Sequence, residues 1–159
     1  MNNYKKLCGR VKCHADYAED IVLIPAGVGE KCFVTGFSDD ASAASKMVSA
    51  EESEHHIPVV PLDDALHGFA PSYIKMDIEG AEEPALLGMR NTVVKYRPTL
   101  AICVYHRPQD VFSFPLLLRS WGLLADFYLQ MYGEHSFETV LYVLPKQHIE
   151  PAPTVAQSH

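Results

Sequence analysis

Hydrophobic residues recur along the chain with the spacing of strands and helices in turn. Residues 99–105 are almost all apolar, which is typical of a parallel strand buried on both faces. Between positions 82 and 96, apolar residues recur at the intervals of one helix face. These runs predict, in order, a strand over 73–77, a helix over 82–96, a strand over 99–105, a helix over 115–121 and two strands over 126–131 and 138–144.

The order of these elements predicts an α/β fold. Right-handed connections through the helices would place the strands over 73–77 and 99–105 side by side and parallel. The last two strands are joined by a short turn around Gly133, which requires an antiparallel hairpin. We therefore expect a mainly parallel sheet ending in an antiparallel hairpin, with Ser113 capping the helix over 115–121 and Gly122 closing it.

The first part of the chain carries weaker signals. Residues 38–56 are rich in Ser, Ala, Asp and Glu, which favours a surface loop. The remaining pattern predicts the end of a helix over 4–11, a buried strand over 21–24 closed by Pro25, a turn over 26–29, a strand over 32–37, an extended segment over 57–62 and one helical turn over 63–66.

Composition narrows the class of protein. The chain has 159 residues, which fits one domain over 1–145, and its proline-containing end, residues 146–159, is expected to be disordered. A net charge of −7 argues against nucleic-acid and membrane partners. The four cysteines lack metal-site spacing and the N-terminus lacks a signal-peptide core, so we expect a cytoplasmic protein.

Titratable side chains follow two of the predicted strands at their carboxyl ends. Asp77 closes the strand over 73–77, and Glu79, two positions on, projects to the same side of an extended backbone. His106 follows the strand over 99–105. Parallel neighbours bring their carboxyl ends to one edge, where open α/β sheets bind ligands, so Asp77 and His106 should lie together. The histidine suits a general base or a substrate contact, whereas acidic residues before a helix equally suit cap and dipole roles.

Around these positions the sequence resembles the FkbM-type methyltransferases. The resemblance begins with Ile74-Lys75-Met76-Asp77-Ile78-Glu79-Gly80-Ala81-Glu82. It continues in order through Leu87-Gly88, Arg97-Pro98, Leu100-Ala101-Ile102, Val104-Tyr105-His106-Arg107-Pro108, Asp110, the stretch 128–132 and Glu138-Thr139-Val140-Leu141-Tyr142. It covers residues 57–144 well and residues 4–36 more loosely.

The resemblance implies a Rossmann-like class I methyltransferase fold. It also implies methyl transfer from the cofactor S-adenosylmethionine to a hydroxyl oxygen of a small molecule or saccharide, and we assign no metal-binding residues. Asp77 matches the residue that closes the family's fourth strand, beside the donor, and His106 matches the residue that closes the fifth, facing the acceptor. The implied catalytic residues are Asp77, Glu79 and His106, and the implied donor-binding residues are Ala26 and Asp77.

Family members also begin with a strand and a glycine-rich turn that hold the donor, and then a second strand ending in an acidic residue. This sequence contains neither, so we expect an N-terminally truncated form of the fold. The strand at 74–77 would then lie at an exposed sheet edge. We expect self-association through that edge or movement of the strand over 21–24 into the gap, together with weak or absent donor binding.

Two other classes of function remain open. Asp77, Glu79 and His106 are oxygen and nitrogen ligands that suit a metal-dependent hydrolase. Alternatively, the missing donor-binding segment would fit a non-catalytic remnant or binding module. Metal titration separates the first class from methyl transfer, and calorimetry with S-adenosylmethionine separates the second.

Overall fold

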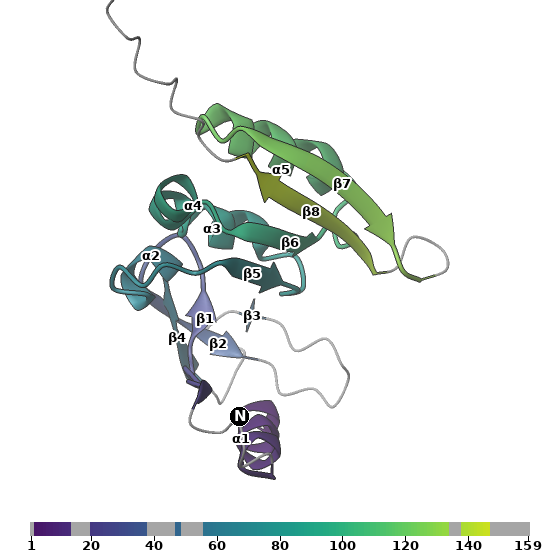
Figure 1. Ribbon diagram of the computed structural model, residues 1–159. Coiled ribbons are helices and arrows are strands. Elements are labelled where there is room, and N and C mark those ends of the chain that lie inside the picture. Colours follow the sequence, from purple (N-terminus) through teal and green to yellow (C-terminus); the bar gives the residue numbers. More distant parts are fainter. Residues whose placement is uncertain (1, 14–19, 38–46, 49–55, 134–137, 147–159) are drawn as a thin grey trace, which may run out of the picture.

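The chain forms a mixed α/β fold with two four-stranded sheets (Figure 1). In this computed structural model the described residues are 2–13, 20–37, 47–48, 56–133 and 138–146. The tail over 146–159 therefore lies outside the described residues, apart from Lys146. No helix within the described ranges combines the length and hydrophobicity needed to cross a bilayer.

The C-terminal sheet, formed by β5 to β8, contains the strands that the hydrophobic pattern predicted. They are β5 (Tyr73–Met76), β6 (Thr99–Cys103), β7 (Ala125–Met131) and β8 (Thr139–Pro145), in the spatial order β5-β6-β8-β7. β5 and β6 are parallel, and β8 is antiparallel to both its neighbours, β6 and β7. The parallel pair and the final antiparallel hairpin are thus confirmed.

The expectation of a mainly parallel sheet is wrong. Among the described strands, two pairings are parallel, β1–β4 and β5–β6, and four are antiparallel. One reason is the place of β8, which enters between β6 and β7 and so adds two antiparallel pairings. The other is that the earlier strands form a sheet of their own instead of extending this one.

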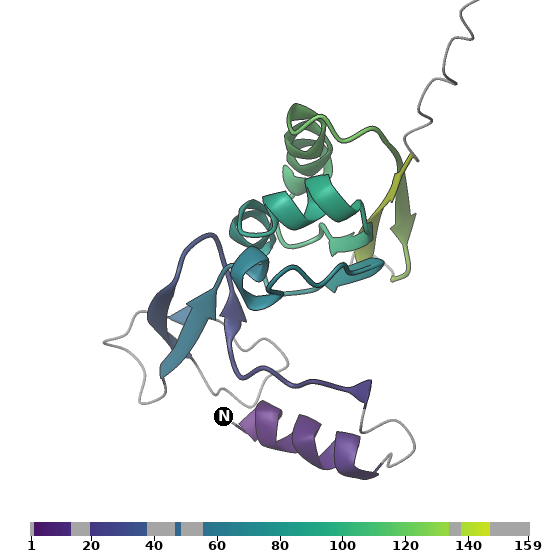
Figure 2. The same ribbon diagram turned by 60° about the vertical axis from the view of Figure 1, so that its left-hand side comes forward.

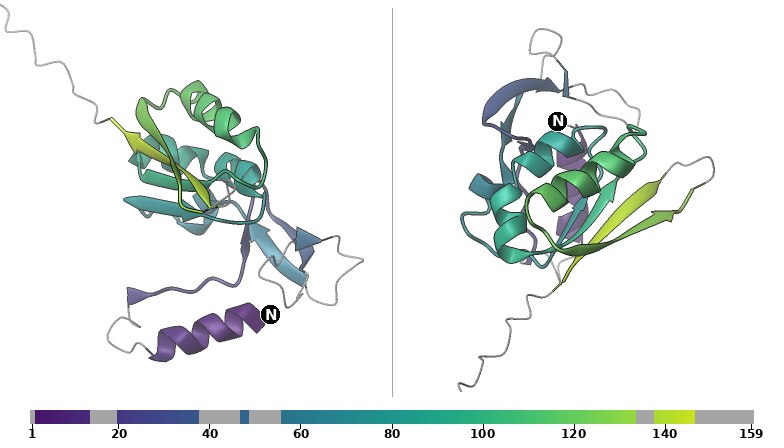
Figure 3. Two further views of the ribbon diagram at one scale, coloured as in Figure 1. Left: turned by 90° about the vertical axis from the view of Figure 1, so that its right-hand side faces the viewer. Right: turned by 90° about the horizontal axis from the view of Figure 1, so that it is seen from above.

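Three helices cover one face of the C-terminal sheet (Figure 2), and Figure 3 shows the same arrangement from two further sides. They are α3 (Glu82–Leu87), α4 (Arg90–Tyr96) and α5 (Asp110–Ser120). Alternation along β6 explains the two faces. Leu100 and Ile102 are fully buried in the main core with the helices, whereas Ala101 and Cys103 belong to a smaller buried cluster with Val140.

The single helix expected over 82–96 is two helices, because the chain changes direction at Gly88 and Met89. The backbone of Gly29, from the N-terminal part of the chain, packs directly against Gly88. A Cβ at Gly88 would collide with the carbonyl oxygen of Gly29. Periodicity could not reveal this break, because the contact comes from a segment far away in sequence.

The helix expected over 115–121 begins five residues earlier, at Asp110. Ser113 therefore lies inside α5 and does not cap it. Gly122 closes the helix as predicted. It has φ +78°, and the amides of Gly122 and Leu123 donate hydrogen bonds to the carbonyls of Arg119 and Leu118, the pattern of a Schellman motif.

The N-terminal sheet, formed by β1 to β4, has the order β1-β4-β2-β3. Its elements are β1 (Gly27–Val28), β2 (Phe33–Phe37), β3 (Met47–Val48) and β4 (His56–Val60), preceded by α1 (Asn2–Cys13) and followed by α2 (Leu62–Ala65). β2 and β4 match the predicted extended segments. β3 and the start of β4 fall within the expected loop over 38–56, whose remaining residues lie outside the described part.

The strand expected over 21–24 is wrong. These residues have no strand conformation, and Ile21, Val22 and Ile24 are exposed. The short strand β1 forms instead within the expected turn and pairs with β4. Consequently the segment 21–24 does not fill the outer edge of β5, which among the described strands pairs only with β6. A run of apolar residues indicates a buried strand only if a partner strand is available to it.

Asp63 links α2, which follows the N-terminal sheet, to α4, which covers the C-terminal sheet. Its carboxylate, in α2, accepts hydrogen bonds from the amides of Asn91 and Thr92 at 3.0 and 2.7 Å, in the first turn of α4. Its own amide donates to the carbonyl of Gly88 at 3.0 Å. Met89, at the start of α4, provides no side-chain cap, so Asp63 supplies from α2 the acceptors that a local capping residue would otherwise give.

Candidate active site

The candidate site lies where β5 and β6 end. Met76 pairs with Ile102 in the parallel register, so the segments that follow these residues leave the sheet at the same edge. Asp77 and Glu79 follow β5, and His106 follows β6. The structure brings these predicted residues together, as the strand order required.

His106 lies among three carboxylates. Its Nε2 is 3.9 Å from Oδ1 of Asp77 and 3.4 Å from Oε2 of Glu79. Its Nδ1 is 3.2 Å from Oε1 of Glu82. The imidazole side chain is 12% exposed, whereas those of Asp77 and Glu79 are 39% and 30% exposed. The two carboxylates beside Nε2 are therefore partly open to solvent, whereas Nε2 itself is buried.

Neither nitrogen of His106 has an aligned hydrogen-bond partner. The 3.2 Å separation from Glu82 is short enough for a hydrogen bond, but its direction is not that of one. The second oxygen of Glu82, Oε2, is also buried without a partner. Buried polar atoms of this kind are uncommon, and they concentrate here in one pair of residues.

Tyr105 contacts both Asp77 and His106. Its hydroxyl donates a hydrogen bond to Oδ1 of Asp77 at 3.1 Å. Its ring lies 4.1 Å from the ring of His106, centroid to centroid. Burial, followed by the hydrogen bond and the negative charge of Asp77, raises the pKa of Tyr105 above its ordinary value of 10.0. The phenol therefore stays a donor to Asp77 across the neutral range.

The loop after β5 is held in an unusual backbone conformation. Glu79 has φ +57° and Gly80 has φ +89°, both in the left-handed region. Glycine adopts this region without strain, whereas glutamate does so at a cost. The amide of Ala81 donates to the carbonyl of Ile78 at 3.2 Å and closes the turn. This tight turn lets the carboxylate of Glu79 approach His106.

Glu82 and Tyr105 belong to the site but were not singled out from the sequence. The local pattern places Glu82 in the acidic first turn of a helix and Tyr105 at the end of an apolar strand, and neither place marks a site residue. Their signals were present in the family signature, which includes both positions. Composition and periodicity alone do not distinguish Glu82 from its neighbour Glu83, which is 52% exposed.

Asp77, Glu82 and His106 each offer an atom that could bind a metal ion, and these atoms lie within 4.8 Å of one another. However, Glu82 lies beside Nδ1 and Asp77 lies nearer Nε2. One ion binds only one of the two ring nitrogens, so only one of these two carboxylates is at its shortest distance from the nitrogen that would hold the ion. Asp77 and Glu79, both on the Nε2 side, leave the hydrolase ligand set geometrically open.

The two predicted donor-binding residues lie next to strands of different sheets. Asp77 follows β5 in the C-terminal sheet, whereas Ala26 directly precedes β1 in the N-terminal sheet. The amide of Ala26 donates to the carbonyl of Ile24 at 2.9 Å. No strand pairing links these two positions within the described residues.

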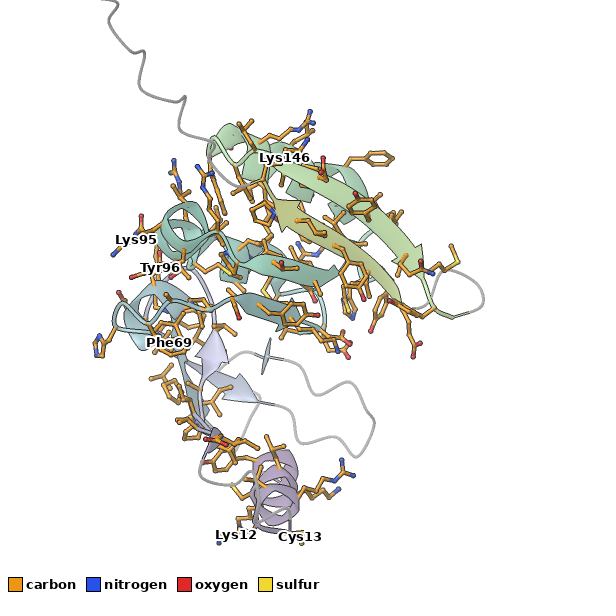
Figure 4. All side chains as sticks on the ribbon, in the orientation of Figure 1. Lys12, Cys13, Phe69, Lys95, Tyr96 and Lys146 are labelled. Atoms are coloured by element: carbon orange, nitrogen blue, oxygen red, sulfur yellow. The ribbon has the colours of Figure 1, made fainter. Side chains whose placement is uncertain are left out.

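A cavity elsewhere in the chain is separate from this site. It has a volume of about 550 Å³ and is lined by Arg119, Gly122, Leu123, Leu124, Ala125 and Lys146. Lys146 follows the last residue of β8, whereas the site lies near the first residues of that strand, where Val140 pairs with Cys103 (Figure 4). The cavity is thus at the opposite end of the sheet.

Comparison with known proteins agrees with the sequence motifs. The sequence model of the methyltransferase FkbM domain matches residues 1–138. Among solved structures, the methyltransferase FkbM from Methylobacillus flagellatus KT is similar, with a TM-score of 0.72 and 28% sequence identity. The match covers 90% of this chain and 34% of that one, so this chain spans about a third of its relative's length. A comparison with curated proteins gave no match. The chain belongs to the FkbM methyltransferase family.

Proposed function

We propose that the chain acts in methyl transfer from S-adenosylmethionine to a hydroxyl oxygen of a small molecule or saccharide. The observation that carries the proposal is the position of His106 among Asp77, Glu79 and Glu82 at the carboxyl ends of two parallel strands. We also assign the C-terminal sheet to the second half of a Rossmann-like methyltransferase sheet, on the basis of its strand order.

In this proposal His106 is the general base. An acceptor hydroxyl has a pKa far above neutrality, so its proton must leave as the new carbon–oxygen bond forms. Nε2 is the ring nitrogen beside the two partly exposed carboxylates and would take that proton. The imidazolium that forms then has a carboxylate beside each nitrogen, Glu82 at Nδ1 and Glu79 and Asp77 at Nε2.

The charge of the site fits the reactive part of the donor. When bound, S-adenosylmethionine supplies a methyl group on a positively charged sulfur, which keeps the electron pair of the broken carbon–sulfur bond. Asp77 and Glu79 are partly exposed carboxylates that attract such a cation to this edge. Tyr105 holds the carboxylate of Asp77 in place through its hydrogen bond. The contribution of these residues is therefore orientation and charge.

The proposed contacts to the donor beyond its sulfur are few. Asp77 would lie beside the sulfur, while Ala26 stays a predicted contact from the other sheet. Its amide already donates to Ile24, so only its side chain and carbonyl would face a ligand. We therefore propose weak donor binding by this chain, carried mainly by the carboxylates at the ends of β5 and β6.

The outer edge of β5 supports a further proposal about partners. Among the described strands this edge is unpaired, and unpaired edges associate with other strands. We propose that the chain self-associates there. Sedimentation velocity over a range of concentrations tests this: the sedimentation coefficient should rise with concentration, and a constant monomer value would contradict it.

The activity is best tested in a longer family member that carries the same motif. Replacing the histidine aligned with His106 by alanine should lower turnover by about 100-fold or more, the usual contribution of a general base. His106 is largely buried beside Glu82, so the variant should also lose some stability, and turnover is compared at a temperature at which the variant stays folded. Unchanged turnover in a folded variant would contradict the assignment of His106 as the base.

Two measurements on this chain separate the other classes of function. A metal-dependent hydrolase should gain thermal stability when Mn²⁺ or Zn²⁺ is added and lose it with a chelator. A non-catalytic binding module should show no calorimetric signal with S-adenosylmethionine. A methyltransferase should show the same thermal stability with and without the metal, and a weak calorimetric signal with S-adenosylmethionine.

A further inference from the structure

Glu82 is a carboxylate that the fold has buried completely. It is the first residue of α3, and its exposed fraction is 0%. Glutamate is rarely buried unless it is paired. Its neighbour Glu83, also in the first turn, is 52% exposed and forms a long ion pair with Arg107, at 3.7 Å. The helix dipole stabilises an acidic side chain in the first turn even when that side chain is exposed, as Glu83 is. The dipole therefore does not explain why Glu82 is buried.

One oxygen of Glu82 reaches both strand-end segments of the site. Oε1 accepts a hydrogen bond from the amide of Ile78 at 3.0 Å, in the loop that follows β5. The same oxygen lies 3.2 Å from Nδ1 of His106, which follows β6. Glu82 therefore connects the turn that carries Asp77 and Glu79 with the imidazole that faces them.

Carboxylates lie beside both ring nitrogens, but they are not equivalent. Glu82 is the nearest, at 3.2 Å from Nδ1, and is fully buried, whereas Glu79 and Asp77 lie 3.4 and 3.9 Å from Nε2 and are partly exposed, so that solvent screens their charge. A neutral histidine carries one N–H, and this difference favours placing it at Nδ1. Nε2 is then left with its lone pair on the side of Asp77 and Glu79, where an acceptor hydroxyl would lie. The other tautomer would set an unprotonated Nδ1 against the carboxylate and an N–H at Nε2, which could not take a proton.

We propose that Glu82 is a positioning residue that holds His106 in the Nδ1–H tautomer, so that Nε2 is free to act as the base. This inference rests on the proposed function for its purpose, but the tautomer itself is independent of any reaction. The direction of the contact in the unliganded chain is not that of an aligned hydrogen bond. Such contacts often tighten only when the substrate is bound.

The occupant of Nε2, and not the position of Glu82, separates this role from metal binding. Glu82 and Asp77 lie at different nitrogens of one ring, as expected when the ring connects a carboxylate to a reacting group. In a metal site the carboxylate on the far nitrogen would orient the ring, and the ion itself would bind Nε2. A bound ion would remove Nε2 as a base, so an ion and a free base at this atom exclude each other.

The test is a long-range ¹H–¹⁵N correlation spectrum of the histidine rings in the whole ¹⁵N-labelled chain. It is recorded at about pH 8.5, where free imidazole is neutral. The signals of His106 are assigned by their loss in His106→Gln. We expect a protonated Nδ1 and an unprotonated Nε2 in the unmodified chain. In Glu82→Leu this pattern should be lost, with a large part of the population shifted to the Nε2–H form.

Two further variants complete the test. Glu82→Gln keeps an oxygen that can accept from Nδ1–H and should retain the tautomer, whereas Glu83→Gln is the matched control and should leave the spectrum unchanged. A predominantly Nε2–H ring in the unmodified chain would overturn the proposal, even if Glu82→Leu failed to fold. Retention of the Nδ1–H form in a folded Glu82→Leu would overturn it as well. If the tautomer is as expected but no methyl transfer occurs, the proposed function fails and the role of Glu82 in placing the proton stands.

Discussion

The hydroxyl of Tyr105 donates a hydrogen bond to Oδ1 of Asp77 across 3.1 Å, which links the ends of two parallel strands. Tyr105 follows β6 and Asp77 follows β5, so the bond crosses the edge of the sheet. It fixes the carboxylate that faces Nε2 of His106 and places the phenol ring against the imidazole. Asp77 is thus oriented by a neighbour on the adjacent strand and does not depend on its own loop alone.

Removing this hydrogen bond should have a modest effect on stability. Tyr105→Phe keeps the ring and deletes the donor, so the free energy of unfolding should fall by about 0.5–1.5 kcal/mol. Urea denaturation measures the change. Tyr128→Phe, at a position that is 55% exposed, is the control and should stay within about 0.5 kcal/mol of the unmodified chain. Equal effects of the two substitutions would show that the bond to Asp77 contributes nothing.

The carboxylate of Asp63 should stabilise the chain by capping α4 from outside the helix. Asp63→Ala removes the acceptors of the Asn91 and Thr92 amides, and the loss of a cap costs about 0.5–2 kcal/mol. The adjacent Asp64 is exposed and does not cap the helix, so Asp64→Ala is the matched control. Thermal unfolding of both variants gives the comparison. A melting temperature lowered equally by the two would contradict the capping role.

Gly88 should tolerate no side chain, because the backbone of Gly29 occupies the space of a Cβ. Gly88→Ala should therefore separate α3 and α4 from the N-terminal sheet and lower the melting temperature. Gly9, in the middle of α1, has open space around it, and Gly9→Ala should stabilise that helix by up to about 1 kcal/mol. Opposite signs for the two substitutions are expected, and a stabilising Gly88→Ala would disprove the close approach.

The stability of the chain should depend on pH through Asp110, which is 2% exposed in the first turn of α5. Burial raises the pKa of Asp110 above its ordinary value of 3.8, partly offset by the positive charge of Arg107. Between the unfolded and folded pKa values the folded chain binds more protons, so this group lowers stability as pH rises through that window. Asp110→Asn removes the effect.

The measurement for Asp110 is the free energy of unfolding of both proteins from about pH 3 to about pH 7. The difference between Asp110→Asn and the unmodified chain should move in favour of the variant as pH rises above the ordinary aspartate value. Parallel curves over this range would mean that the burial of Asp110 does not affect its protonation.

Much of the C-terminal sheet could be predicted from sequence because its signals are local. The unbroken apolar run of β6 and the short turn before β8 determine a buried strand and an antiparallel hairpin without reference to the rest of the chain. The rule that parallel strands share a carboxyl edge then brings Asp77 and His106 together. The same few residues therefore predicted both the strands and the position of the site.

The features that were missed depend on contacts between distant segments. The break between α3 and α4 lies where the backbone of Gly29 approaches Gly88. The apolar segment 21–24 is not a strand because no partner lies beside it. Glu82 and Glu83 are identical in type and adjacent in sequence, yet one is fully buried beside His106 and the other is exposed. Periodicity carries no information about such partners.

The most direct test of the central claim is a titration of the ¹⁵N-labelled chain with S-adenosylmethionine, followed by amide chemical shifts. The account predicts weak binding, with Kd on the order of 1 mM, and shifts concentrated in the turn over 77–82 and around His106. S-adenosylhomocysteine lacks the positive charge and should bind less tightly, and Asp77→Asn should reduce the preference for the charged donor. Absence of shifts at a donor concentration of about 10 mM, or shifts confined to the cavity beside Lys146, would contradict the placement of methyl-transfer chemistry at the ends of β5 and β6.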